Sequence, residues 1–538
     1  PYPTLFRSDT YSDHYLIDLE GKQKPVLLAK RISASADLSP SGKYYLWFDP
    51  NDSLWYALEN SSGKTYVIHT KTPAIFADQD HDTPSPPRPY GIAGWTQDDR
   101  SVLIYDKTDI WEWEPNQGQP ALCLTNKEIA EDPLRKRYIR TNPDEIYISK
   151  DSTWLLSGFR IHSKRASYIS FSYKNQSYTI LNEGPWSLGR PEKSKRSDGY
   201  LFTRESFTEF PDLWVADHNF NSIHKISDAN PQQKNYLWGS AELISWVSSD
   251  GIRLEGVVYK PENFESQKQY PVIVYFYERN AEELYAHHSP RPSRSTINPA
   301  FYTSNGYIVF IPDIVYKTGQ PGEDAFHCIV SGVNYLIQSG WADPGRIGLQ
   351  GQSWGGYQVA YLITRTDLFA CAMAGAPVAN MTSAYGGIRW ESGRSRMFQY
   401  EKTQSRIGGS LWELPHRYLS NSPLFYADRI RTPLLIMSND KDGAVPWYQG
   451  IEMFTALRRL EKPCWMLVYN NEEHNLKASS WGNRMDLSIR MQQFFDHYLK
   501  GKPAPNWMTE GIPAKWKGIR NGFEQSVPIE PCFNTKRG

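Results

Sequence analysis

The chain has 538 residues, which is too long for one compact core and predicts two or more domains. Lys plus Arg and Asp plus Glu number 59 each, so neither the basic excess of a nucleic-acid-binding protein nor an acidic, disordered chain is expected. No segment approaches the ~18 consecutive apolar residues of a membrane helix, and the five cysteines are scattered without a C-x-x-C pair, which argues against a membrane span, a disulfide scaffold and a zinc site.

Residues 1–240 contain short runs of β-forming residues that are broken by Gly, Asn, Asp and Ser. One pattern recurs, in which a polar turn and a strand are followed by a second strand with a central aromatic residue. These aromatic residues are Trp55, Trp111, Tyr168 and Trp214, at intervals of 56, 57 and 46 residues. Propeller blades repeat every ~40–50 residues, so this region is predicted to be part of a β-propeller. A β-sandwich with irregularly spaced turns is the alternative.

The repeats amount to about five blades, because residues 6–30 look like the end of one blade that precedes the four fuller ones. A propeller that does not close on itself leaves exposed edge strands. We therefore expect further blades upstream of Pro1, in a longer polypeptide. The sequence does not indicate in which cellular compartment the protein is located.

Residues 241–505 have a different sequence pattern. After a hairpin signal at Ser249-Asp250-Gly251, apolar runs alternate with segments of helical periodicity. The eight extended runs are Leu243–Ser248, Leu254–Tyr259, Pro271–Tyr277, Tyr307–Ile311, Arg346–Leu349, Ala370–Gly375, Leu434–Ser438 and Trp465–Tyr469. Helical periodicity marks the stretches 325–336 and 487–498. This region is predicted to form an eight-stranded, mostly parallel sheet covered by helices. Residues 506–538 are expected to be a C-terminal tail.

A G-x-S-x-G motif follows the fifth run, with Ser353 between Gly351 and Gly355. An ordinary Gly/Ser turn can have this sequence, but its place between an apolar run and a small-residue stretch is typical of a nucleophile elbow. In an α/β-hydrolase the nucleophile follows the fifth strand of the sheet. We therefore predict an α/β-hydrolase domain with Ser353 as the nucleophile.

A serine nucleophile needs a histidine base and an acid, which follow it in this fold in the order Ser, acid, His. His474 comes after the eighth run and is the predicted base, although a solvated loop histidine is the ordinary alternative. Asp440 and Asp442 come after the seventh run, and their spacing allows only one of them to face the histidine. All three lie on loops at the carboxyl ends of strands, as Ser353 does. No metal site and no cofactor is implied.

Two donors are needed for the oxyanion of a tetrahedral intermediate. The backbone N–H of Trp354, directly after the serine, is the first candidate. The HGGG-type loop that often supplies the second is absent, since Glu278 and Arg279 follow the third run. The hydroxyl of Tyr277, at the end of that run, is therefore the second candidate, with an aromatic side chain packed in a buried strand as the alternative.

The segment Gly386–Gly409 is rich in arginine and follows the sixth run. Its arginines are Arg389, Arg394, Arg396 and Arg406. Arginines beside a cleft can bind a substrate carboxylate in a bidentate manner. Ion pairs with Glu391 and Glu401 on a solvated insertion are the commoner outcome for such a run.

With these residues, the chain resembles the prolyl oligopeptidase family of serine peptidases, and its dipeptidyl-peptidase and acylaminoacyl-peptidase members in particular. These proteins join a β-propeller to an α/β-hydrolase domain. The resemblance covers residues 240–505 closely and rests on the segments Gly351–Tyr357, Asp442–Pro446, Asn471–Leu476 and Tyr270–Tyr277. It implies that Asp442 is the catalytic acid, since the family's aspartate stands three residues before the loop valine, and that Tyr277 is the second oxyanion donor.

The resemblance is weaker for substrate specificity. Dipeptidyl peptidases of the family hold the substrate amino terminus with a Glu-Glu pair in the propeller, and residues 1–240 contain none. The segment after Ala376-Pro377-Val378 has fewer aromatic residues than the family's proline pocket. We therefore expect a serine peptidase that acts on peptides or unstructured termini, with access gated by the propeller and no implied preference for proline. An esterase, or a propeller-based binding protein with an inactive hydrolase domain, is the alternative, and the oligomeric state is open.

Overall fold

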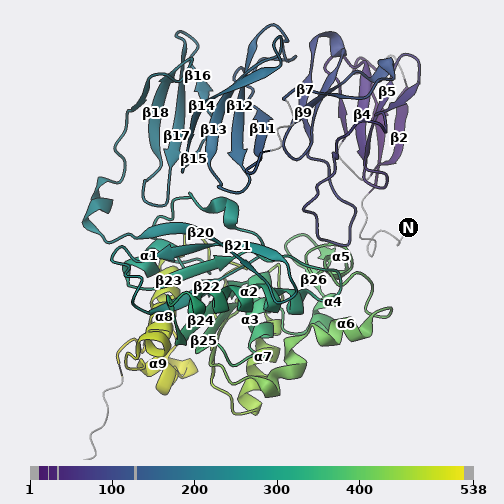
Figure 1. Cartoon of the computed structure of the whole chain (residues 1–538). Coiled ribbons are helices and arrows are strands. Elements are labelled where there is room, and N and C mark those ends of the chain that lie inside the picture. Colours follow the sequence, from purple (N-terminus) through teal and green to yellow (C-terminus); the bar gives the residue numbers. More distant parts are fainter. Residues whose placement is uncertain (1–10, 18, 22–23, 33–35, 126–129, 526–538) are drawn as a thin grey trace, which may run out of the picture. The chain divides into compact units, whose positions relative to one another are not determined.

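The computed structural model describes residues 11–17, 19–21, 24–32, 36–125 and 130–525. The chain divides into two compact units (Figure 1). The first comprises Pro1–Lys234 and the short segment Glu282–His287, and the second comprises Asn235–Ala281 and His288–Gly538. The polypeptide therefore leaves the first unit near residue 234, returns to it for six residues and then completes the second unit.

The first unit is built from antiparallel sheets that follow one another along the chain. A two-stranded sheet, β1–β2, is followed by the four-stranded sheets β3–β6, β7–β10 and β11–β14 and by a five-stranded sheet, β15–β19. Their strands are β1 (Ser12–Leu16), β2 (Val26–Ile32), β3 (Ala36–Leu38), β4 (Tyr44–Asp49), β5 (Leu54–Glu59), β6 (Thr65–Val67), β7 (Ile92–Trp95), β8 (Val102–Tyr105), β9 (Ile110–Trp113), β10 (Leu122–Cys123), β11 (Leu134–Tyr138), β12 (Thr153–Arg160), β13 (Ala166–Ser172), β14 (Ser177–Gly184), β15 (Ser187–Leu188), β16 (Glu192–Lys193), β17 (Gly199–Glu205), β18 (Asp212–Asp217) and β19 (Ile223–Lys225). Residues 6–10 of the segment expected to end a further blade lie outside the described residues.

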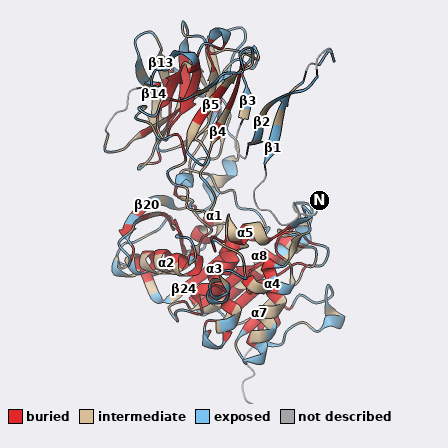
Figure 2. Cartoon of the chain, turned by 90° about the vertical axis from the view of Figure 1, so that its right-hand side faces the viewer, coloured by how far each residue is buried: buried red, intermediate tan, exposed pale blue. Residues whose placement is uncertain are grey.

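Hydrophobic clusters hold the successive sheets of the first unit together, and each cluster draws residues from two of them. Tyr44 of β4 stacks on Trp95 of β7, with ring centroids 5.6 Å apart. Tyr168 of β13 meets Phe202 of β17 edge to face at 5.3 Å. Figure 2 shows buried residues concentrated in the strands. Face-to-face packing of neighbouring sheets through large aromatic side chains is therefore the main source of stability here.

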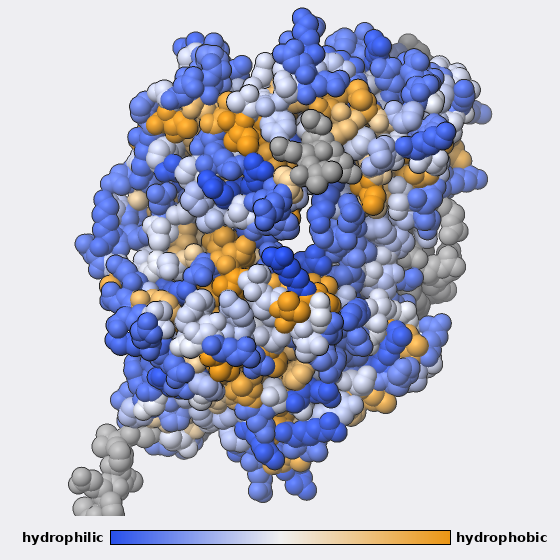
Figure 3. Space-filling view, in the orientation of Figure 1, coloured by the Kyte–Doolittle hydropathy of each residue, from blue (hydrophilic) through white to orange (hydrophobic). Residues whose placement is uncertain are grey.

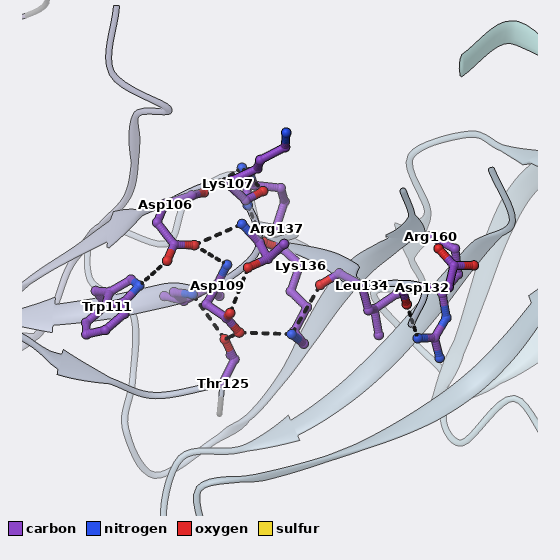
Figure 4. A network of polar contacts seen from close by, with 12 residues as sticks. Asp106, Lys107, Asp109, Trp111, Thr125, Asp132, Leu134, Lys136, Arg137 and Arg160 are labelled. Carbon is purple, nitrogen blue, oxygen red and sulfur yellow. Dashed lines mark hydrogen bonds and ion pairs between the residues drawn. The ribbon is translucent and has the colours of Figure 1, made fainter. Parts of the chain in front are cut away.

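A buried polar network also joins sheet β7–β10 to strand β11 (Figure 4). Lys136 Nζ lies 2.9 Å from Asp109 Oδ1, and each side chain is only 2% exposed. The Thr125 hydroxyl donates to the same carboxylate oxygen at 2.7 Å. Arg137 donates to the carbonyl oxygens of Asp106 and Lys107. Since a buried charge needs a partner, these contacts fix the register of one sheet against the next.

The second unit contains an eight-stranded sheet in the order β20-β21-β23-β22-β24-β25-β28-β29. The first two pairings, β20 with β21 and β21 with β23, are antiparallel, and the remaining pairings are parallel. The strands are β20 (Ser240–Val247), β21 (Arg253–Lys260), β22 (Tyr270–Tyr275), β23 (Ile308–Pro312), β24 (Ala342–Gln352), β25 (Cys371–Gly375), β28 (Leu434–Met437) and β29 (Cys464–Leu467), with a separate hairpin of β26 (Ile388–Arg389) and β27 (Arg394–Ser395). Each of the eight apolar runs in the sequence overlaps one strand of this sheet.

The helices of the second unit are α1 (Pro299–Ser304), α2 (Pro321–Gln338), α3 (Trp354–Leu362), α4 (Met381–Tyr385), α5 (Met397–Glu401), α6 (Pro415–Ser420), α7 (Tyr448–Arg459), α8 (Trp481–Lys500) and α9 (Asn506–Thr509). Of these, α1, α2, α3, α7 and α8 pack against the sheet (Figure 1). Helix α2 begins with a proline, has acidic residues in its first turn and buries Ala325, Ile329, Val333 and Leu336 on one face. Helix α8 ends at Gly501, whose φ of 67° suits a left-handed cap.

Residues that follow α8 fold back onto that helix. Trp507 is buried, and its Nε1 donates to Gln493 Oε1 at 2.8 Å. Gln493 Nε2 in turn donates to the Phe523 carbonyl at 2.7 Å. The first part of the expected tail is thus packed, while residues 526–538 lie outside the described residues.

On the face shown in Figure 3, hydrophilic residues predominate and hydrophobic ones occur in small groups among them. None of the described helices combines the length and the apolar character needed to cross a membrane.

Candidate active site

Ser353 occupies a strained turn between β24 and α3. Its backbone has φ 62° and ψ −114°, a conformation that residues with a side chain rarely adopt. The turn is fixed by the Ser353 N–H, which donates to the Gly375 carbonyl of the neighbouring strand β25 at 2.8 Å. A sharp turn of this kind lifts the serine side chain out of the regular path of the strand.

Three glycines around Ser353 are required by close backbone contacts. A Cβ on Gly351 would lie 2.4 Å from the Gly355 carbonyl. A Cβ on Gly355 would lie 2.5 Å from the carbonyl of Phe276, and one on Gly356 would lie 2.3 Å from the carbonyl of Gly375. The G-x-S-x-G-G sequence is therefore explained by how tightly α3 passes the ends of β22 and β25.

His474 and Asp442 meet directly. His474 Nδ1 lies 2.7 Å from Asp442 Oδ2, and the carboxylate side chain is fully buried. The other carboxylate oxygen, Oδ1, accepts hydrogen bonds from the backbone N–H groups of Ala444 and Val445, both at 2.8 Å. The aspartate is thus held on one side by its own loop and presents its other oxygen to the imidazole.

The second predicted acid, Asp440, has different partners. Its carboxylate accepts from Asn470 Nδ2 at 2.9 Å and from the Asn471 N–H at 2.6 Å. Partial burial raises the pKa of Asp440, but these hydrogen bonds outweigh it and leave the pKa below its ordinary value. Asp440 therefore ties its loop to the loop that follows β29, away from the imidazole of His474.

The loop that carries His474 is also tied to the strand that carries Ser353. Gln352 Nε2 donates to the His474 carbonyl at 2.8 Å, and Asn439 Nδ2 donates to the Glu473 carbonyl at 2.7 Å. These bonds bring His474 beside the residue that precedes the serine. Within the described residues, no hydrogen bond joins the Ser353 hydroxyl to the His474 ring.

The two predicted oxyanion donors both lie at the start of α3. Trp354 is the first residue of α3, so its backbone N–H has no acceptor within the helix. The ring of Tyr277 approaches Gly355, because a Cβ built on that glycine would lie 3.7 Å from Tyr277 Cδ2. The backbone of Tyr277 is fixed as well, since its carbonyl accepts from Gln358 Nε2 at 3.0 Å.

Gln404 is a site residue that sequence reasoning missed. Its Nε2 donates to the Tyr277 hydroxyl at 2.9 Å, so it occupies an acceptor position of that hydroxyl and leaves the O–H proton to be donated elsewhere. Gln404 lies in the irregular insertion after β25, and no motif or periodicity singles it out.

The four arginines of the insertion have separate environments. Arg389 pairs with Glu391 at 3.5 Å, and Arg394 is exposed. Arg406 is buried, pairs with Glu278 at 3.3 Å and stacks over the Tyr316 ring. Glu401 accepts from the Tyr385 hydroxyl at 2.6 Å instead of from an arginine.

Arg396 is only 2% exposed and contacts the loop of the candidate acid. Its Nη1 donates to the Ala444 carbonyl, and its Nη2 donates to the Tyr400 hydroxyl at 3.4 Å. The Ala444 carbonyl and the Val445 N–H belong to one peptide group, and this N–H donates to Asp442, so a single peptide group connects the guanidinium to the acid. Arg396 is thus placed to hold this loop.

The described part of the chain contains no candidate metal site, because no group of three or more His, Cys, Asp or Glu side chains there is arranged to hold an ion. The adjacent histidines His287 and His288 have no spaced acidic or cysteine partner in the sequence, and His288 Nε2 lies 3.1 Å from the Tyr259 hydroxyl.

Comparison with known proteins identifies the region that carries this site. Residues 292–502, which include Ser353, Asp442 and His474, match the model of the prolyl oligopeptidase family. This part of the chain is similar to the prolyl oligopeptidase family. Tyr277 lies outside the matched residues.

Two curated relatives show how the prolyl oligopeptidase region compares with full-length proteins. Dipeptidyl-peptidase 5 of Porphyromonas endodontalis is 27% identical over 302 residues, which cover 50% of this chain and 40% of the relative. The acylamino-acid-releasing enzyme of Sus scrofa is 26% identical over 252 residues, which cover 43% of this chain and 32% of the relative. The matched part of the chain thus spans less than half the length of either relative.

A solved structure extends the likeness beyond the prolyl oligopeptidase region. The crystal structure of dipeptidyl peptidase 4 of Porphyromonas gingivalis has a TM-score of 0.64 and covers 90% of this chain and 67% of its own. At 16% identity this likeness concerns the fold alone.

Proposed function

We propose that the chain is a serine peptidase that hydrolyses peptides or unstructured termini through an acyl-enzyme on Ser353. The observation that carries the proposal is the 2.7 Å contact between His474 Nδ1 and the buried Asp442, on a loop that Gln352 ties to the serine strand. The similarity of residues 292–502 to a peptidase family and the names of the relatives support the same reaction class.

In the proposed mechanism, His474 Nε2 accepts the proton of the Ser353 hydroxyl as the oxygen attacks the scissile carbonyl. Asp442 keeps the Nδ1–H tautomer and stabilises the imidazolium that forms. His474 then gives the proton to the leaving amine, and water, activated by the same histidine, hydrolyses the acyl-enzyme.

The oxyanion of each tetrahedral intermediate is proposed to accept hydrogen bonds from the Trp354 N–H and the Tyr277 hydroxyl. The Gln404 amide that donates to this hydroxyl would direct its proton toward the oxyanion. The buried Arg396 is assigned the support of the Asp442 loop. The more exposed Arg389 and Arg394 remain candidates for contact with a substrate carboxylate.

We also propose that the successive sheets of the first unit are blades of a β-propeller that restricts access to the active site. Packing of each sheet on the next through shared hydrophobic clusters supports blades rather than a two-sheet sandwich. Rates on one cleavable sequence, presented as a short peptide and within a folded host protein, test this restriction. Similar rates on both would contradict it.

The proposed reaction is tested with a fluorophosphonate probe and with matched peptide amides and esters. Labelling of the wild-type chain that is lost in Ser353→Ala, together with hydrolysis of at least some amides, is expected. Cleavage of esters only would favour an acyl hydrolase of another kind. The absence of labelling and of hydrolysis would leave a binding protein with an inactive hydrolase domain.

A further inference from the structure

The first unit contains a cavity of about 730 Å³ that the proposed function does not use. Side chains from sheets β7–β10 and β11–β14, from the region of β15 and from Glu282–His287 line it, and all of them belong to this unit. Sites for small ligands usually measure ~300–1,000 Å³. The cavity can therefore hold a group as large as a few peptide residues.

The lining is strongly cationic. Five of its side chains are Arg or Lys and one is Glu, namely Arg135, Arg137, Arg140, Lys164, Arg190 and Glu282. Glu282 is already engaged by Arg135 through two hydrogen bonds of 3.1 Å. Over the described ranges, Arg137, Arg140 and Arg190 take part in no ion pair. The cavity thus has a surplus of positive charge that an anion would offset.

Arg137 is the most firmly positioned of these cations (Figure 4). Its Nη1 donates to the Lys136 carbonyl at 2.8 Å, and its Nη2 donates to the carbonyls of Asp106 and Lys107 at 2.9 and 3.2 Å. The guanidinium also lies 4.5 Å from the centre of the Tyr105 ring. Contacts with neutral carbonyls and a ring fix the group in place without cancelling its charge.

The residue whose carbonyl accepts from Arg137, Asp106, has a carboxylate that other donors hold. Asp106 accepts from the N–H groups of Thr108 and Asp109 at 2.9 and 2.6 Å and from Trp111 Nε1 at 2.8 Å. At another point of the lining, the Tyr138 hydroxyl donates to Glu145 at 2.7 Å. Neutral donors thus hold both carboxylates, and in the described part of the chain neither carboxylate forms an ion pair with an arginine of the lining.

Two polar atoms of the lining residues are buried without a hydrogen-bond partner. They are Ser167 Oγ and Trp186 Nε1, and Ser167 is only 1% exposed. A Cβ on Gly158, which also lines the cavity, would approach Ser167 Oγ to 2.2 Å. The glycine thus leaves room beside this hydroxyl. Buried donors without partners are costly unless a ligand satisfies them.

We propose that this cavity binds the carboxylate of an acidic peptide, either an Asp or Glu side chain or a free C-terminus. The arginines supply paired donors for the carboxylate, and the partly exposed aromatic side chains of Trp186 and Tyr285 supply apolar surface for the rest of the peptide. This binding does not depend on the reaction proposed for the second unit.

The test is calorimetric titration of the full chain carrying Ser353→Ala, so that no peptide is consumed. The probes are acetyl-Ala-Ala-Glu-amide, acetyl-Ala-Ala-Gln-amide and acetyl-Ala-Ala-Gln with a free C-terminal carboxyl. At least one acidic peptide is expected to bind about ten-fold or more tightly than the neutral amide, and less tightly as salt rises. The acidic peptide that binds better identifies which carboxylate is recognised.

Two variants locate the binding. Arg140→Gln combined with Arg190→Gln changes two exposed side chains of the lining and should lower the affinity about ten-fold without affecting the fold. Arg100→Gln is the matched control, because Arg100 is an exposed arginine of the same unit outside the lining. Arg137→Gln should abolish binding, with a melting curve to check its fold.

Three outcomes would overturn the proposal. They are equal affinity for the acidic and neutral peptides, tight binding that the double variant leaves unchanged, and inorganic phosphate binding as tightly as the better acidic peptide. None of them depends on whether Ser353 is a nucleophile.

Discussion

Two aspartates that stand two positions apart have separate partners, and this difference can be measured. Asp442→Asn should reduce kcat by about 10⁴-fold, because an amide in contact with His474 Nδ1 favours the wrong tautomer. Asp440→Asn should reduce it by no more than about ten-fold, since Asp440 contacts Asn470 and Asn471. Steady-state kinetics on one peptide substrate compares the two variants. Equal losses of kcat would show that the assignment of Asp442 as the acid is wrong.

The Tyr277 hydroxyl is expected to act only on the transition state. Tyr277→Phe should lower kcat by about 10²–10³-fold with little change in KM, as removal of one oxyanion donor does elsewhere. Gln404→Leu should cause a smaller loss, because it removes the amide that orients this hydroxyl. Tyr275→Phe, within β22, is the control. Unchanged turnover of Tyr277→Phe would remove this residue from the site.

Arg396 is predicted to position the Asp442 loop rather than to bind substrate. Arg396→Met should lower kcat and shift the pH profile of kcat/KM. The reason is that Ala444, whose N–H donates to Asp442, loses the hydrogen bond that its carbonyl accepts from Arg396. KM should change equally for anionic and neutral peptides. The control is Arg431→Met, which removes a contact with Asp367 between two exposed side chains of the same unit. A selective rise in KM for anionic peptides in Arg396→Met would instead indicate substrate binding.

At the scale of elements, the network between sheet β7–β10 and strand β11 should contribute strongly to stability. Asp109→Ala leaves the ammonium of Lys136 buried without its carboxylate and should lower the free energy of unfolding of the first unit by about 3–5 kcal/mol. Glu114→Ala removes a pair with Arg100, which is 71% exposed, and should cost about 1 kcal/mol or less. Urea denaturation compares the two, and similar losses would contradict the prediction.

The elements differ in how far the sequence reveals them. The eight apolar runs overlap the eight strands of the second unit. For the strands paired in parallel, the reason is that a strand buried between helices needs apolar residues on both faces. Ser353 is found for a similar reason, since its strained turn leaves a glycine signature. The insertion after β25 has no such signature. The contacts of Gln404 with Tyr277 and of Arg396 with Ala444 join residues 127 and 48 positions apart, which only tertiary structure reveals.

The division into units is likewise beyond the reach of sequence patterns. The sequence pattern changes near residue 240, from short β-like runs to alternating apolar and helical segments. This is close to Lys234, where the main part of the first unit ends. The amino-acid composition does not reveal that Glu282–His287 belongs to the first unit, because this depends on tertiary contacts such as those between Arg135 and Glu282. Patterns in the local sequence predict local secondary structure. The assignment of a six-residue segment to the first unit depends instead on contacts with residues far away in the chain.

Because the hydrophobic clusters of the two units contain different residues, the whole molecule should unfold in two transitions. Asp109→Ala should lower the midpoint of one transition, and Leu349→Ala, at a fully buried position in β24, should lower the other by a loss of about 2–5 kcal/mol. A fluorophosphonate bound to Ser353 should raise only the transition that Leu349→Ala lowers, since ligands stabilise the unit that binds them. Differential scanning calorimetry of the full chain makes the measurement. A single transition that both variants lower by the same amount would mean that the units unfold cooperatively, despite their separate cores.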